Sequence, residues 1–237
     1  MSPQNTDSPA NITSETNDKN VVREYFNSIG FERWQKIYGD GPVNRVQQSI
    51  RTGHQQTIDT VLEWLGEDLR GVSICDAGCG LGSLSLPLAE RGAQVSGFDI
   101  SEKMIEEAIQ IRNKTFVSSQ NPHFEVREVE AIAGKYDVVI CLDVLIHYPL
   151  EDVEKMLAHL SSLSRSRLLL TFAPKTPFLT ILKKVGGFFP GASKTTRAYQ
   201  HREKDLLTLL QKLGWTLSNR AAIDDKFYFA RLFEAKR

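Results

Sequence analysis

Hydrophobic positions follow two different periods through the middle of the chain. Short apolar runs rich in β-branched residues alternate there with stretches in which apolar residues recur every three or four positions. The first pattern is typical of buried strands and the second of amphipathic helices. The alternation of the two patterns predicts strands at 72–76, 94–99, 123–127, 136–142 and 167–172, and helices at 84–91, 101–113 and 151–163. We therefore expect an α/β fold with a doubly wound, mostly parallel sheet covered by helices on both faces.

The segment before this region has a different character. Residues 1–18 are polar and almost free of large apolar side chains, which predicts a disordered tail. Residues 19–70 are expected to form a helical arm. Its helices are predicted at 22–29, closed by Gly30 as a C-cap, then at 31–38, ended by a glycine-rich turn, and at 44–65.

Residues 71–237 are expected to form the core, which is interrupted once. Residues 173–202 carry six basic and no acidic residues, interleaved with seven large apolar side chains. This pattern predicts a cap insertion for an amphipathic anionic ligand, although a solvated loop or a shallow contact with a membrane surface would have a similar composition. A helix at 203–213 and strands at 215–222 and 227–234 would complete a seven-stranded sheet.

Charge and cysteine content exclude several classes of protein. The 29 basic residues balance the 29 acidic ones, so no net charge attracts nucleic acid or anionic membranes. Residues 1–20 lack the basic and apolar regions of a secretion signal, and no apolar run is long enough to cross a membrane. The three cysteines lie in apolar, strand-like surroundings and predict buried thiols, not disulfides or a zinc site. We expect a cytoplasmic protein.

A glycine-rich loop is the first candidate for chemistry. Asp76, Gly78, Gly80 and Gly82 alternate with other residues between the first strand and the next helix. Glycines let backbone amides approach a ligand closely, and a helix start suits an anionic group. Asp99 ends the second strand and could accept hydrogen bonds from both ribose hydroxyls of a nucleotide-like ligand. Either motif alone could be structural, but the pair predicts a nucleoside site.

A weaker signal follows the third strand. Glu128 and Val129 could read an adenine ring through a carboxylate and a backbone amide, or they could be solvated loop residues.

The two motifs, in this order, resemble those of the class I S-adenosylmethionine (SAM) methyltransferases, which have a Rossmann-like fold. Other segments resemble the magnesium-protoporphyrin IX methyltransferase family more closely, and this resemblance spans residues 20–237. They include Ile50-Arg-Thr-Gly-His-Gln-Gln56, Cys141-Leu-Asp-Val-Leu-Ile-His-Tyr-Pro149 and Thr171-Phe-Ala-Pro-Lys175.

The resemblance implies methyl transfer from SAM to one propionate of magnesium protoporphyrin IX, in chlorophyll synthesis. It also implies a soluble or loosely membrane-associated enzyme, peripheral to photosynthetic membranes, with the large subunit of magnesium chelatase as a partner. The magnesium belongs to the substrate, so no protein-bound metal is expected.

The expected cofactor site extends beyond the two motifs. Ile100 and Cys141 are also expected to belong to the cofactor site. Arg51 could pair with the methionine carboxylate, or it could be a solvated helix arginine.

His147 follows the fourth strand, at the sheet edge where such folds bind ligands. It could orient the propionate, offer a nitrogen to the porphyrin magnesium or be structural; magnesium prefers oxygen ligands. The resemblance suggests catalytic roles for His147 and for an arm tyrosine. Tyr38 is preferred because its glycine-rich flank allows movement, with Tyr25 on the substrate side, although both could be core residues.

The remaining expected substrate-binding residues are polar or basic. Asp143 ends the fourth strand and could bind the substrate, hold the amino group of the cofactor or cap a loop. The cations of the insertion suit the propionates of a porphyrin, namely Lys175, Lys194 and Arg197.

Two other functions share some of these features. A quinone O-methyltransferase would have the same Asp76–Asp99 layout, and a porphyrin carrier would bind pigment without chemistry. A nucleic-acid methyltransferase is disfavoured by the zero net charge and by the residues after the fourth strand, which are not Asn/Asp-Pro-Pro-Tyr/Phe.

Overall fold

The computed structural model of the protein describes residues 19–39, 41–116, 120–176 and 198–237. The expected tail at 1–18 and most of the expected insertion, including Lys194 and Arg197, lie outside the described residues.

The described residues form one seven-stranded sheet with the order β3-β2-β1-β4-β5-β7-β6. Strands β1 to β5 run parallel, and β7 is antiparallel to both of its neighbours, β5 and β6. This confirms the predicted doubly wound, mostly parallel sheet. The strands are β1 (Ser73–Ala77), β2 (Gln94–Asp99), β3 (His123–Val126), β4 (Tyr136–Cys141), β5 (Ser164–Phe172), β6 (Thr216–Asp225) and β7 (Tyr228–Lys236).

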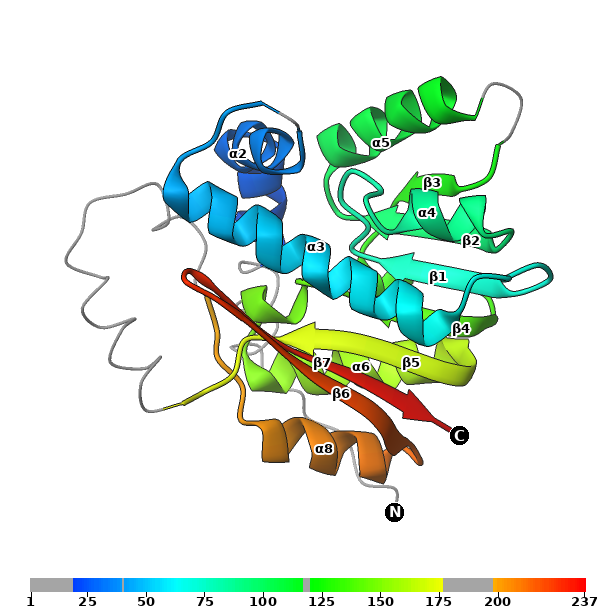
Figure 1. Ribbon diagram of the computed structural model, residues 1–237. Coiled ribbons are helices and arrows are strands. Elements are labelled where there is room, and N and C mark those ends of the chain that lie inside the picture. The colour runs from blue at the N-terminus through cyan, green and yellow to red at the C-terminus, as the bar shows by residue number, and fades with distance from the viewer. Residues whose placement is uncertain (1–18, 40, 117–119, 177–197) are drawn as a thin grey trace, which may run out of the picture.

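Helices cover both faces of this sheet. One face packs against α3 (Arg45–Leu65), α4 (Ser85–Glu90) and α5 (Glu102–Thr115), and α3 crosses in front of the sheet in Figure 1. The other face packs against α6 (Leu150–Leu163) and α8 (Glu203–Lys212). The expected arm, residues 19–70, thus contains a helix, α3, that contributes Ile58, Val61, Leu62 and Leu65 to the main core.

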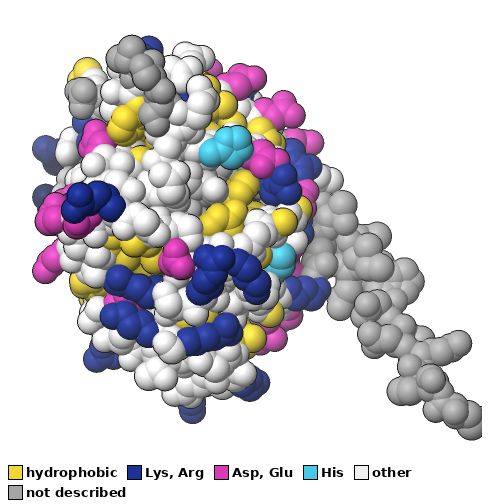
Figure 2. Space-filling view, turned by 90° about the vertical axis from the view of Figure 1, so that its right-hand side faces the viewer, with side chains coloured by type: hydrophobic (Ala, Val, Ile, Leu, Met, Phe, Trp, Pro, Cys, Tyr) yellow, Lys and Arg dark blue, Asp and Glu magenta, His cyan; other side chains and the backbone are white. Residues whose placement is uncertain are grey.

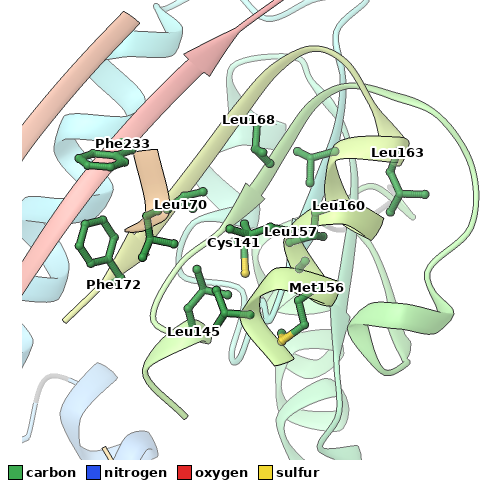
Figure 3. Close-up of a cluster of buried hydrophobic side chains, with 14 of the residues drawn as sticks. Cys141, Leu145, Met156, Leu157, Leu160, Leu163, Leu168, Leu170, Phe172 and Phe233 are labelled. Atoms are coloured by element: carbon green, nitrogen blue, oxygen red, sulfur yellow. The ribbon is translucent and has the colours of Figure 1, made fainter. Parts of the chain in front are cut away.

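Strand β4 shows why the central strands are apolar without alternation. Val138 and Ile140 pack toward α3 and α4, whereas Val139 and Cys141 pack toward α6. Figure 3 shows the second cluster, in which Cys141 lies among leucines of β5 and α6. A parallel strand buried on both faces needs apolar side chains at every position, so its sequence reads as a continuous run.

The predicted helix starts are confirmed at α3 and α5. The side chain of Asn44 accepts a hydrogen bond from the backbone N–H of Gln47, and Gln47 returns one to Asn44 in a capping box. Ser101 caps α5 by accepting a hydrogen bond from the backbone N–H of Met104.

The prediction of Gly30 as a C-cap is wrong. Residues 19–26 are helical, a turn follows at 27–28, and Gly30 lies in the first turn of α2 (Ile29–Tyr38). A Cβ atom at Gly30 would lie 2.6 Å from both the Cε1 atom and the carbonyl oxygen of Tyr25. Glycine is required here by the close approach of Tyr25, which a periodicity argument does not detect.

The two ends of the parallel strands differ in what surrounds them. Residues 19–26 and α2 lie at the carboxyl ends, on the left in Figure 1. Figure 2 shows the opposite end, where Lys and Arg side chains occur together with Asp and Glu on the same face. Within the described ranges, no helix combines the length and apolar character that crossing a membrane requires.

Candidate active site

A cavity opens at the carboxyl ends of the parallel strands, and its empty space is about 780 Å³ when the open solvent at its mouth is included. The loops that follow β1, β2, β3 and β4 form its floor, and the N-terminal helices form its outer wall. Open α/β sheets bind their ligands in this position, because the loops diverge there. Of the expected site residues, those that line it are Tyr38, Gly78, Gly80, Asp99, Ile100, Glu128, Val129, Asp143 and His147.

The glycine loop presents backbone to the cavity. Gly78 and Gly80 have φ angles of 84° and 53°, a region that L residues with side chains rarely adopt. A Cβ atom on Gly78 would lie 2.1 Å from a methyl group of Val144. The backbone N–H groups of Gly78 and Cys79 both donate to the carbonyl oxygen of Phe98, at 2.7 and 2.9 Å, which ties the loop to β2.

Asp76 and Gly82 belong to the same motif but do not line the cavity. The buried carboxylate of Asp76 accepts a 2.6 Å hydrogen bond from Ser85 Oγ, and burial raises its pKa to about 6. Gly82 has a φ of 82°, and a Cβ atom there would lie 2.7 Å from the ring of Phe124. Both residues therefore support the loop on its core side, away from the cavity.

Asp99 stands at the base of the cavity. Its carboxylate accepts hydrogen bonds from the backbone N–H groups of Gly80, at 3.0 Å, and Ser101, at 2.9 Å. Burial raises the pKa of Asp99, and these backbone donors oppose that rise. Each carboxylate oxygen has further acceptor capacity, so the group can also accept the hydroxyls of a ribose.

Glu128 and Val129 line the cavity, and Glu128 also holds the arm. Its carboxylate accepts a hydrogen bond from the guanidinium of Arg23, and Lys19 pairs with Glu130 at 3.0 Å. These ion pairs fasten residues 19–26 to the loop after β3. Glu128 therefore has a structural role, holding the arm, in addition to its place in the cavity lining.

Aromatic side chains of the arm form the outer wall of the cavity. The rings of Trp34 and Tyr38 stack with centroids 5.4 Å apart, and Phe26 meets His147 edge to face at 5.3 Å. Tyr25 is placed differently: it is buried against Phe26 and is not among the lining residues. The structure thus brings Tyr38, and not Tyr25, to the cavity.

Burial affects both candidate catalytic groups. It lowers the pKa of His147 to about 4, against a smaller opposing effect of Asp143, so the ring is neutral near pH 7. The Nδ1 atom of His147 is buried and has no hydrogen-bond partner among the described residues. Burial, with Asp143, Asp99 and Asp76 nearby, raises the pKa of Tyr38 well above its ordinary value, so its hydroxyl remains a donor.

Two further expected cofactor ligands, Arg51 and Cys141, do not reach the cavity. Arg51 donates to the backbone carbonyl oxygens of Ile37 at 2.7 Å and Lys36 at 2.8 Å, and so caps the end of α2. Its partners are carbonyls that the helix end leaves unsatisfied, not a methionine carboxylate. Cys141 is fully buried in the core between β4 and α6 (Figure 3), because the alternation of the strand turns its side chain away from the sheet edge.

The described ends of the insertion lie next to His147. The backbone N–H of Tyr199 donates to the carbonyl oxygen of Ile146 at 2.7 Å, and that of Lys175 donates to His201 at 2.8 Å. Lys175 itself does not line the cavity described above. Both ends of the expected cap therefore start beside the short helix η2 (Leu145–His147).

Comparisons with known proteins agree with this geometry. Residues 141–237 match the family described as "Magnesium-protoporphyrin IX methyltransferase C-terminus", and residues 68–185 match a general methyltransferase domain. A magnesium-protoporphyrin O-methyltransferase from Synechocystis is 54% identical over 222 residues, which cover 93% of this chain and 96% of the relative. This chain belongs to the magnesium protoporphyrin IX methyltransferase family.

Two further members support the assignment. The chloroplastic magnesium protoporphyrin IX methyltransferase of Arabidopsis thaliana is 54% identical over 222 residues, covering 92% of this chain and 71% of the relative. The crystal structure of the Synechocystis magnesium protoporphyrin IX methyltransferase with bound SAH has a TM-score of 0.86 and 52% identity, and the match covers 92% of this chain and 99% of that one.

Several lining residues of this family member were not predicted from its sequence as site residues. Val22, Phe26 and Trp34 lie in the arm helices predicted at 22–29 and 31–38, and the structure turns these three side chains toward the cavity. Lys19 and Arg127 carried no signal that distinguishes them from solvated cations. Aromatic residues spaced four apart in a segment outside the alternating core, such as Trp34 and Tyr38, are the sequence feature that indicates this wall.

Proposed function

We infer that this chain transfers a methyl group from SAM to a propionate carboxylate of magnesium protoporphyrin IX, giving the monomethyl ester. The observation that carries the inference is the cavity: a glycine loop and Asp99 lie on its floor and an aromatic arm forms its wall. The full-length match to the Synechocystis and Arabidopsis enzymes supports the same acceptor. By the names of these relatives, we place the reaction in chlorophyll synthesis.

The residues around the cavity fit the methyl donor. The space beside Gly80 is open, so a ligand can approach its backbone, and the Asp99 carboxylate can accept the ribose hydroxyls of that ligand. Ile100 and Val129 would flank the adenine. When bound, the donor supplies an electrophilic sulfonium methyl group.

The acceptor needs little activation by the protein. A propionate has a pKa of about 4–5 by analogy with Glu, so it is already ionised near pH 7. Correct placement of two reactants can contribute about 7–11 kcal/mol in favourable cases. We propose that Phe26, Trp34 and Tyr38 exclude water from the carboxylate and that the Tyr38 hydroxyl donates a hydrogen bond to it.

We propose that neutral His147 orients the same carboxylate. A neutral imidazole carries one N–H donor, and the buried Nδ1 atom has no competing partner among the described residues. A donor aimed at a carboxylate oxygen would hold the other oxygen in line with the sulfonium methyl group. We propose Asp143 as a further cavity group, and Lys175, Lys194 and Arg197 as cations for the propionates.

Domain division, location and partners are also proposals. We propose a helical arm at 19–70 and a core at 71–237. We propose further that the first part of the arm, about residues 20–42, and the insertion at 173–202 together cover the porphyrin. A cytoplasmic enzyme that meets photosynthetic membranes only peripherally, and that receives its substrate from the large subunit of magnesium chelatase, fits the resemblance to the family.

One assay tests the proposed reaction. Protein incubated with SAM and magnesium protoporphyrin IX should form a porphyrin heavier by a single methyl group, detected by mass spectrometry. A catechol-type quinol serves as the competing acceptor. Methylation of the quinol alone would indicate a quinone O-methyltransferase, and porphyrin binding without any ester would indicate a carrier.

The cofactor assignment is tested by Asp99→Ala. This variant removes the acceptors for buried ribose hydroxyls, so SAM binding should weaken by about tenfold or more in calorimetry. Asp68→Ala is the matched control, because Asp68 is an exposed aspartate that pairs with Arg70. An Asp99→Ala variant with the affinity of the parent would contradict the assignment.

A further inference from the structure

A hydrogen-bond network lies behind the cavity wall and joins four distant segments of the chain. Its members are His54 and Thr57 from α3, Asp143 after β4, Thr171 from β5 and Tyr228 from β7. Only Asp143 among them lines the cavity. The others can affect a bound ligand only through the groups that they hold.

Tyr228 reaches Asp143 across the surface of α3. Its hydroxyl lies 2.9 and 3.0 Å from the two carboxylate oxygens of Asp143, and 3.2 Å from Thr57 Oγ1. The ring passes directly over Gly53, where a Cβ atom would lie 2.2 Å from the Cδ1 atom of Tyr228. The missing side chain at Gly53 therefore opens the slot through which Tyr228 approaches the site.

His54 contacts two cavity residues at once. Its Nδ1 atom lies 2.9 Å from Oδ2 of Asp143, and its ring centroid lies 4.8 Å from that of Tyr38. The His54 side chain is only 11% exposed, so solvent screens the contact with Asp143 weakly. One imidazole thus links the carboxylate at the end of β4 to the aromatic wall of the arm.

Asp143 adopts a conformation that needs support. Its φ of 56° places a non-glycine residue in the left-handed region, which costs free energy unless the surroundings impose it. Its backbone N–H donates to Thr171 Oγ1 at 2.7 Å, and that hydroxyl donates back to its carboxylate at 3.2 Å. Together with Tyr228 and His54, these bonds determine both the backbone and the side chain of Asp143.

The network also keeps Asp143 ionised. Burial by itself would raise its pKa, but hydrogen bonds from His54, Tyr228 and Thr171 outweigh burial and lower it. Asp143 interacts electrostatically with five other titratable side chains of the described residues, namely His54, Tyr228, Tyr38, His147 and Cys141. A carboxylate with fixed donors keeps its charge and its place without reorganisation when a cation arrives.

We propose that Tyr228 and His54 are positioning residues for methyl transfer, which fix the Asp143 carboxylate in the cavity wall so that its charge faces the cationic part of the methyl donor. SAM carries a sulfonium and an ammonium group, and either is complementary to a buried carboxylate. The proposal rests on the proposed function for the identity of the donor. It assigns roles to two side chains that do not line the cavity.

Tyr228→Phe is the sharpest test, because it keeps the ring over Gly53 and removes only the hydroxyl. SAM binding is measured by calorimetry over a range of pH. Loss of a donor to a charged acceptor should weaken binding by about tenfold. The variant should also change the pH dependence of SAM binding. Without the Tyr228 hydroxyl, Asp143 has one hydrogen-bond donor fewer and its pKa rises. On acidification, the variant should therefore lose affinity for SAM at a higher pH than the parent protein does.

Two further variants separate positioning from stability. Gly53→Ala should displace Tyr228 and shift the pH dependence of SAM binding in the same direction. Leu160→Ala, a fully buried position of α6 in the core cluster on the other face of the sheet, should lower the melting temperature without moving that pH dependence. Binding by Tyr228→Phe with the parent affinity and pH dependence, beside a lowered melting temperature, would overturn the proposal. Because the readout is SAM binding, this failure differs from a failure of the parent protein to form the ester.

Discussion

A chain that starts after residue 42 is expected to lose methyl transfer while retaining part of its affinity for SAM. The truncation removes Val22, Phe26, Trp34 and Tyr38 from the cavity wall, but it leaves the glycine loop and Asp99 in place. Water would then reach the acceptor carboxylate, and its alignment would be lost. We expect turnover to fall by about a hundredfold or more, measured as monomethyl ester formed per minute.

Removal of residues 1–18 alone is the matched control, because the ion pairs of Lys19 and Arg23 with the loop after β3 remain possible. This shorter truncation should keep nearly full activity. Full activity after removal of residues 1–42 would mean that the arm only packs against the core, and the proposed cover over the porphyrin would be wrong.

His147→Ala is expected to lower kcat by about a hundredfold and to change porphyrin affinity much less. The imidazole is proposed to align the carboxylate at the moment of transfer, so its loss should affect the reaction more than binding. Because burial lowers the pKa of His147 to about 4, kcat of the parent protein should stay level through the ordinary histidine range near 6.5. It should fall only at lower pH, where the propionate (pKa about 4–5) and then His147 become protonated.

The control for this variant is His159→Ala. His159 also hydrogen-bonds through its ring, to the carbonyl oxygen of Ile132 at 2.9 Å, but it lies on α6 away from the cavity. The His159→Ala variant should lower the stability of the protein without the hundredfold loss of kcat expected for His147→Ala. An unchanged kcat with a raised KM in His147→Ala would indicate that the histidine contributes uniform binding and does not align the acceptor.

Periodicity was sufficient for most of the architecture. The five parallel strands, the final antiparallel pair and the starts of α3 and α5 lie within a few residues of their predicted bounds. These features depend on neighbours in the sequence: a strand buried on both faces is apolar throughout, and a helix start needs a capping side chain. The error at Gly30 arose where a contact with Tyr25, and not the local pattern, requires glycine.

The site was predicted less evenly. Asp99 and the backbone of Gly78 and Gly80 could be placed because a motif fixes them relative to the strand ends. Arg51 and Cys141 were placed wrongly because the direction of each side chain depends on tertiary packing. Arg51 points to the carbonyl oxygens at the end of α2, and Cys141 points into the core. Only the packing of α3 shows that Arg51 faces the end of α2.

The sequence by itself determined the order of strands and helices and the presence of a nucleoside site at one sheet edge, because both follow from local periodicity and a short motif. Only the tertiary structure decided which side chains of the arm line that site and that His54 and Tyr228 meet at Asp143. Those partners are 89 and 85 residues away from Asp143 in the chain. Their meeting depends on how α3 and β7 pack on the sheet, and no local pattern of polar and apolar residues encodes that arrangement.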